Sequence, residues 1–117
     1  MSLDLSLKIY MPEKVALEQK VYRVVLPYNN GKTITIGKGR APSLITMEMG
    51  EIKVLNEKDD IVQEFYFSGG IADVKNDECS ILTEGIFDKK DLNKEKVHDL
   101  YQNFPNPFYK WLVEHYK

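Results

Sequence analysis

Hydrophobic and polar residues alternate along most of the chain between Leu5 and Leu82. A repeat of two residues is typical of a β-strand with one buried face, because successive side chains point to opposite sides of the strand. The residues between Pro12 and Val21 are expected to form only a short polar link. The pattern predicts a series of short strands over residues 5–11, 21–26, 33–36, 44–49, 50–54, 61–67, 71–74 and 79–82.

Residues that favour turns separate these strands. Asn30-Gly31 is a strong hairpin signal, and charged or polar turns are expected at Asn56–Asp60 and at Asn76-Asp77. Gly69-Gly70 marks a bend, because glycine adopts backbone angles that other residues avoid. Short strands at regular spacing with turn residues between them predict an antiparallel β-sandwich or barrel.

The pattern changes after Glu84 to that of two short helices. Asn93 is a candidate N-cap, with Leu92 and Val97 placed to form a hydrophobic staple. Pro105 ends the first helix, and Asn106-Pro107 begins a second one. The expected apolar faces contain Val97, Leu100, Tyr101 and Phe104 in the first helix, and Phe108, Trp111, Leu112 and His115 in the second. We therefore predict a sandwich domain over residues 1–86 and a helical hairpin over residues 87–117.

The helical tail is rich in aromatic residues, which allows two interpretations. These residues either seal the short helices onto the sandwich or form a docking surface for another protein chain. The first interpretation is favoured. Helices of this length do not persist alone in water, so they must pack on each other, on the sandwich or on a partner. The residues concerned are Tyr101, Phe104, Phe108, Tyr109, Trp111 and Tyr116.

Composition narrows the class of protein. The chain has 117 residues, 43% hydrophobic residues and a net charge of -2, which is typical of one globular domain and gives no basic footprint for nucleic acid. The single Cys79 cannot form an internal disulfide, which favours a reducing compartment. No apolar run is long enough for a membrane-spanning helix.

Candidate catalytic chemistry is weak throughout. Ser68 precedes two glycines but lies between strands, whereas a nucleophile elbow joins a strand to a helix. His98 and His115 have no Cys or His partner at the spacing of a zinc site. The glycine-rich loop at residues 37–42 is not followed by a helix that could bind phosphate. We expect no enzyme activity, no metal and no cofactor.

Four segments resemble one protein family in the same order. Phe65–Val74 resembles the (Y)(L/V)SGG(I/F)xEV core of the epsilon subunit of F-type ATP synthases, the homologue of the mitochondrial delta subunit. Gly39–Leu44 is similar to its GHAPLL loop, and Gly50–Val54 resembles its Gx(I/V)x(I/V) strand. Asp91–Asn93 resembles the link into its helices.

The resemblance implies a flattened antiparallel β-sandwich of about ten strands followed by an α-helical hairpin. It further implies a non-catalytic rotor subunit of the central stalk, which links the gamma subunit to the c-ring and couples rotation to ATP synthesis. The implied partners are gamma, the c-ring and, through the complex, the alpha/beta hexamer. The implied location is the cytoplasmic face of a bacterial plasma membrane, with only indirect contact with lipid.

The resemblance also assigns candidate site residues. The gamma-facing surface would include Ser68, Gly69, Gly70 and Ile71, because the missing side chains would allow a partner's backbone to approach closely. The ring-facing loop would include Thr33, Lys38, Gly39, Arg40, Ala41 and Pro42. Within it, Arg40 replaces a usual His, Thr33 replaces a frequent acidic residue, and Lys38 replaces a common proline.

The C-terminal part departs from the family. Some members bind ATP through an (I/L)DxxRA motif, for which this chain has Leu92–Val97, with Asn93 and Lys96 as remnants of a degraded site. A helix of ten residues reaches only about 15 Å. We therefore expect a shortened helical domain with weak or absent inhibition of ATP hydrolysis.

An alternative from a different class is a small ligand-binding or interaction module. In that case Phe65, Tyr66 and Tyr22 would line a groove on the sandwich.

Overall fold

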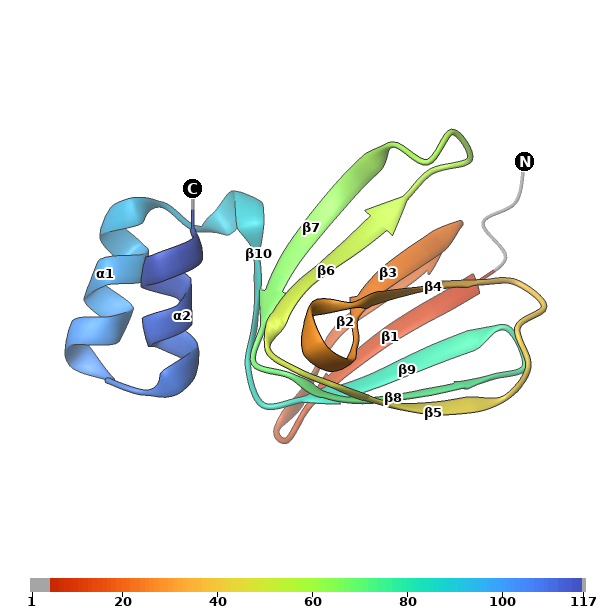
Figure 1. Ribbon diagram of the computed structural model, residues 1–117, viewed down its shortest axis with the longest axis horizontal. Helices are drawn as coiled ribbons and strands as arrows, with labels where there is room; N and C mark the ends of the chain where they lie inside the picture. Colours follow the sequence, from red (N-terminus) through yellow and green to blue (C-terminus); the bar gives the residue numbers. More distant parts are fainter. Residues whose placement is uncertain (1–4, 117) are drawn as a thin grey trace.

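The computed structural model describes residues 5–116, which form a sandwich of two sheets followed by two helices (Figure 1). The first four strands are β1 (Leu5–Met11), β2 (Lys14–Val21), β3 (Arg23–Pro27) and β4 (Thr33–Gly37). They are followed by β5 (Ser43–Met47), β6 (Gly50–Leu55), β7 (Ile61–Phe67), β8 (Gly70–Lys75), β9 (Glu78–Thr83) and β10 (Ile86–Asp88). The helices are α1 (Lys94–Asn103) and α2 (Pro107–His115), with short 3-10 turns η1 (Asn29–Gly31) and η2 (Lys89–Asp91).

Each sheet contains five strands. Sheet A has the order β2-β1-β9-β8-β5, and sheet B has the order β10-β7-β6-β3-β4. Neighbouring strands are antiparallel except for β1 and β9, which run parallel. The predicted sandwich is thus confirmed, with one parallel pair that the sequence pattern did not indicate.

The core lies between the two sheets and is formed by the alternate residues that the sequence pattern marked as buried. Leu5, Leu7 and Ile9 of β1 are fully buried, whereas the residues between them are partly exposed. Sheet B contributes Val24, Leu26, Ile36, Ile52, Val54, Phe65 and Phe67 to the same core. Alternation along each strand therefore sets which face of each sheet is apolar.

Two strands were missed by the sequence pattern. β2 occupies the stretch that was expected to be a polar link, and it pairs with β1 at the edge of sheet A. A register shift between Ile9 and Tyr10 breaks its alternation. β10 has only three residues and continues through residue 88, past the expected domain division after residue 86. That division stays a prediction.

The hairpin predicted at Asn30-Gly31 is confirmed. β3 and β4 pair with Pro27 opposite Thr33, and η1 forms the turn. Asn30 and Gly31 both have positive φ angles, of 57° and 78°. These angles explain why Asn and Gly occupy the turn, since they adopt this region most readily.

The two helices begin at the predicted caps. The side chain of Asn93 accepts a hydrogen bond from the Lys96 amide, and that of Asn106 accepts one from the Tyr109 amide, both at 2.8 Å. Leu92 and Val97 lie in one buried cluster, as expected for a hydrophobic staple. Phe104 differs from the prediction, because 64% of its surface remains exposed.

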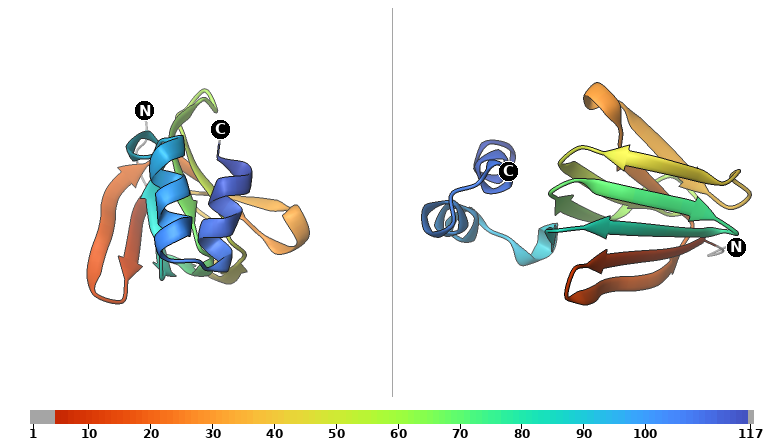
Figure 2. Two further views of the ribbon diagram at one scale, coloured as in Figure 1. Left: turned by 90° about the vertical axis from the view of Figure 1, so that its left-hand side faces the viewer. Right: turned by 90° about the horizontal axis from the view of Figure 1, so that it is seen from below.

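The helices lie side by side at one end of the sandwich (Figure 1; Figure 2). Tyr66, from the outer face of sheet B, forms a second buried cluster with Leu92, Val97, Phe108 and Leu112. Phe87, Tyr109, Trp111 and Tyr116 pack against this cluster. The sealing role predicted for the tail aromatics is confirmed for these residues, whereas Tyr101 and Phe104 lie outside the cluster.

Candidate partner-docking site

The Ser68-Gly69 corner carries the chain from sheet B to sheet A. Gly69 and Gly70 have φ angles of +95° and +154°, which favour glycine. A Cβ atom on Gly69 would lie 3.0 Å from the Met47 carbonyl oxygen, and one on Gly70 would overlap the Leu82 carbonyl oxygen. This chain's own backbone therefore explains why both residues are small.

The structure gives a different reason for the two corner glycines from the one predicted from sequence. The two glycines were expected to make room for another subunit, but the atoms that fill that room belong to β9, to the end of β5 and to the residues that follow β5. The predicted interface at Ser68, Gly69, Gly70 and Ile71 stays a prediction.

A buried hydroxyl network fixes the corner. Thr83 is 3% exposed, and its hydroxyl donates to the Gly69 carbonyl oxygen at 2.7 Å. The Ser68 hydroxyl lies 3.2 Å from the Thr83 oxygen, and the Ser68 amide donates to the Gly85 carbonyl oxygen at 2.9 Å. Ser68 therefore serves as a structural hydrogen-bonding residue at this corner.

The outer face of sheet A has an apolar end beside this corner. Strand register places Val15, Tyr10, Leu82 and Ile71 in one row across four strands. Val15, Leu82 and Ile71 are 45% to 56% exposed. Exposed apolar residues that form a contiguous patch often mark an interaction surface, whereas single exposed apolar residues are common on any protein. Ile71, predicted from sequence to face a partner, belongs to this row.

The next row of the same face is polar. It contains Glu18, Lys8, Ser80 and Asp73, with Leu44 at its end on β5. Lys8 forms an ion pair with Glu78 at 3.1 Å. This hydrogen-bonded pair raises the pKa of Lys8 and lowers the pKa of Glu78. The face is thus divided into a charged end and an apolar end.

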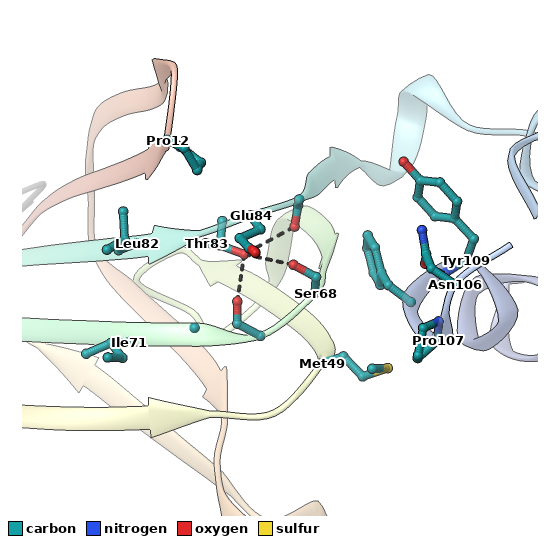
Figure 3. A pocket seen from close by; sticks show the side chains of 14 residues that line it. Pro12, Met49, Ser68, Ile71, Leu82, Thr83, Glu84, Asn106, Pro107 and Tyr109 are labelled. Atoms are coloured by element: carbon teal, nitrogen blue, oxygen red, sulfur yellow. Dashed lines mark hydrogen bonds between the residues drawn. The ribbon is translucent and has the colours of Figure 1, made fainter. Parts of the chain in front are cut away.

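A cleft of about 800 Å³ adjoins the apolar row (Figure 3). One wall comes from the sandwich and includes Met49, Ser68, Ile71 and Leu82, and Pro12 lies at its rim. The other wall is the start of the second helix, Asn106–Tyr109. Its lining is mainly apolar, which is typical of sites that accept apolar groups. The row and the cleft are together called the apolar docking surface.

The residues predicted to face the ring lie at the two ends of one strand. Thr33 begins β4, whereas Lys38, Gly39, Arg40, Ala41 and Pro42 follow its end. A strand of this length separates the two groups by about 13 Å. The Gly39 amide donates to the Asp77 carboxylate at 2.8 Å, which ties the loop to the turn between β8 and β9. The structure therefore separates Thr33 from the other five residues.

Asn93 and Lys96, the predicted remnants of a nucleotide motif, have roles in the helix start. Asn93 caps α1, and the Lys96 ammonium donates to the Asp91 carbonyl oxygen at 3.2 Å. These contacts account for both residues. Their predicted role as a degraded nucleotide site stays a prediction.

Groups with catalytic potential are held in structural contacts. Burial, together with Asp73, raises the pKa of the Cys79 thiol to about 12, so the reactive thiolate is scarce at neutral pH. His98 contacts Gln102, and a ring nitrogen of His115 lies 2.9 Å from the Trp111 carbonyl oxygen. Residues 5–116 contain no cluster of three or more His, Cys, Asp or Glu residues arranged to hold a metal ion.

The groove expected for the alternative ligand-binding module is absent from the described residues. Phe65 and Tyr66 are neighbours on β7 and point to opposite faces, the first into the core and the second under the helices. They are only 5% and 2% exposed. The prediction that both line one groove is wrong, because adjacent strand residues cannot share a face.

Comparison with known proteins agrees with this architecture. Residues 4–89 match the family described as ATP synthase, Delta/Epsilon chain, beta-sandwich domain. The chain belongs to this family. The resemblance found in the Phe65–Val74 segment is thereby confirmed, as is the prediction of an F-type ATP synthase epsilon subunit.

Relatives in bacteria support the same membership. The ATP synthase epsilon chain of Pelagibacter ubique is 32% identical over 101 residues, which cover 86% of this chain and 75% of that protein. The epsilon chain of Rhizobium rhizogenes is 28% identical over 94 residues, which cover 80% and 68%.

Solved structures share the fold. A chain of the Euglena gracilis mitochondrial ATP synthase structure with OSCP, F1 and c-ring has a TM-score of 0.69 at 16% identity, with 97% of this chain and 75% of that chain covered. A chain from the central stalk and c-ring of the Tetrahymena thermophila enzyme has a TM-score of 0.62 at 16% identity, with coverage of 97% and 93%. No helix among residues 5–116 is both long and apolar enough to cross a membrane.

Sequence reasoning missed most of the apolar docking surface. Val15 lies on the unpredicted strand β2, and the helix wall depends on how the hairpin docks. A usable signal was present in Ile71 and Leu82, which are apolar residues at outward positions of their strands. Their pairing across β8 and β9 could not be read from sequence alone.

Proposed function

We propose that this chain is a non-catalytic rotor subunit that joins gamma to the c-ring and so couples rotation to ATP synthesis. Family membership and the names of its relatives support this role. The proposed location is the cytoplasmic face of a bacterial plasma membrane, where contact with lipid is indirect. Gamma and the ring are the direct partners, and the alpha/beta hexamer is reached through the complex.

The observation that carries the proposal is the apolar docking surface. A rotor subunit must transmit torque through a stable contact, and stable contacts have an apolar centre with a polar rim. The row formed by Val15, Tyr10, Leu82 and Ile71 supplies such a centre, and the charged row around Lys8 borders it. Gamma is therefore assigned to the apolar end of sheet A.

A pair of matched substitutions tests this assignment. Leu82 and Leu44 both lie on the outer face of sheet A and are 56% and 75% exposed, but only Leu82 belongs to the apolar docking surface. Leu82→Asp is expected to weaken binding to a complex of gamma with the alpha/beta hexamer by about tenfold or more, which corresponds to about 1.4 kcal/mol. Leu44→Asp should bind like the wild type.

The result is read from titrations of purified, folded variants. Unchanged thermal unfolding would show that each variant retains its structure. Wild-type affinity of Leu82→Asp, or an equal loss in Leu44→Asp, would contradict the assignment of gamma to this surface.

The ring contact is proposed in two parts, because Thr33 and the Lys38–Pro42 loop lie at opposite ends of β4. Cysteines introduced at Thr33 and at Ala41, each paired with a cysteine in the polar loop of the c subunit, would test the two parts separately. Cross-linking from at least one position is expected. No cross-link from either position would contradict a ring contact at Thr33 and at the Lys38–Pro42 loop.

A further inference from the structure

The cleft is built from two parts of the chain that are not held together by β-sheet hydrogen bonds. Met49, Ser68, Ile71 and Leu82 belong to the sandwich, whereas Asn106–Tyr109 open α2 (Figure 3). The two parts meet at Phe108, whose ring lies 3.4 Å from the position that a Cβ atom on Gly85 would take, at ordinary van der Waals distance. Any group that fills the cleft must therefore contact the sandwich and the hairpin at once.

The charges around the cleft indicate the chemistry of its occupant. Among the described residues that line the cleft, Glu84 carries a negative charge and none carries a positive one. Glu48 is exposed between Met47 and Met49, close to the same corner. An apolar cleft with an acidic rim favours an apolar side chain flanked by Lys or Arg.

We propose that gamma inserts a large apolar side chain, flanked by basic residues, into this cleft and thereby clamps the helical hairpin against the sandwich. This inference rests on the proposed function, since it takes the occupant from the partner assigned there. The helix wall then belongs to the binding site. Gamma binding and hairpin docking are coupled, and by thermodynamic reciprocity each strengthens the other.

Charge substitutions at Pro107 test whether the helix wall takes part. Pro107 is exposed, lines the cleft and occupies the first turn of α2. Pro107→Lys should bind the gamma complex roughly two- to fivefold more weakly than Pro107→Glu, the effect of one exposed charge pair, and added salt should reduce the difference.

Lys110→Glu is the matched control. It changes the charge of the first turn of the same helix but lies outside the cleft lining. Because the helix dipole favours negative charge at this end, the control separates an effect on helix stability from an effect on binding. Lys110→Glu is expected to keep wild-type affinity. Equal affinities of the two Pro107 variants would overturn the assignment of the helix wall to the site.

Hydrogen exchange tests the coupling itself. Binding of the full chain to the gamma complex should slow amide exchange in α2 by about fivefold or more, within the usual range of coupling between sites. The complex could form, and Leu82→Asp could weaken it, while amide exchange in α2 stays unchanged. That result would overturn the clamp and leave the proposed function intact. Absence of any complex would instead contradict the proposed function.

Discussion

Tyr66 of β7 and Trp111 of α2 meet edge to face, with ring centroids 5.6 Å apart and ring planes at 70°. Tyr116 approaches the same ring at 6.0 Å, and its hydroxyl donates to the Leu92 carbonyl oxygen at 2.8 Å. Such aromatic pairs add about 0.5–1.5 kcal/mol beyond the burial of their surface. The hairpin is therefore held to the sandwich by a cluster centred on one strand residue.

Trp111→Ala is expected to loosen this attachment. Truncation of fully buried Trp or Phe costs about 3–5 kcal/mol, and the half-buried Trp111 should cost about 2 kcal/mol of unfolding free energy. Urea unfolding measures the loss, and Val113→Ala serves as control because Val113 is 38% exposed on the same helix. Equal effects of the two substitutions would show that the aromatic cluster does not hold the hairpin.

High pH should weaken the same attachment. Burial raises the pKa of Tyr66 above its usual 10.0, an effect that the nearby Lys89 partly opposes. Because the folded pKa is raised, the stabilisation is complete below about pH 10 and is lost as the pH rises through the folded pKa. Urea unfolding across this range should show a steeper alkaline loss in the wild type than in Tyr66→Phe. Parallel stability curves for the two proteins would show that ionisation of Tyr66 does not cause the alkaline loss.

Gly70→Ala should disrupt the corner, because its Cβ would overlap the Leu82 carbonyl oxygen. We expect a loss of more than about 3 kcal/mol of unfolding free energy, or failure to fold. Gly39→Ala is the control for backbone strain alone. Gly39 has a φ of +83°, but apart from its two chain neighbours no atom of the described residues lies within 4 Å of the place that an alanine methyl group would take, so its cost should be about 1 kcal/mol. Similar losses at both positions would show that strain, and not overlap, makes glycine necessary.

The hairpin is expected to have little inhibitory effect on ATP hydrolysis. α1 and α2 contain 10 and 9 residues, so each spans only about 15 Å, and the cluster around Tyr66 keeps them docked. Trp111→Ala should loosen the hairpin without changing the hydrolysis rate of the reconstituted complex. A clear fall in the rate would indicate that the released helices inhibit. A complex that lacks this subunit gives the uninhibited reference rate.

The sequence predicted the elements that depend on local signals. Asn93 and Asn106 were recognised as caps because each bonds to an amide three residues later, a contact that needs no tertiary structure. The strands with regular alternation were found for the same reason. β2 was not found, because a register shift and an edge position remove its alternation.

Features that depend on long-range packing were harder to predict. The Gly69-Gly70 corner was located correctly, but the contacts that explain it come from the Leu82 and Met47 carbonyl groups, which are distant along the chain. The cleft also required knowledge of where α2 docks. Thr33 and Arg40 are close in sequence, yet an intervening strand keeps them apart.

The parallel pairing of β1 with β9 has a consequence for synthesis of the protein. Leu7 of β1 lies beside Cys79 of β9. β1 is synthesised first, but it can complete its pairing only after β9 has been synthesised. Until Glu78–Thr83 have left the ribosome, β1 can pair with β2 alone, and its other edge stays open. Contacts of this sequence separation slow folding and expose strand edges to wrong partners. We therefore expect this edge of β1 to stay open to wrong pairing until the ninth strand emerges.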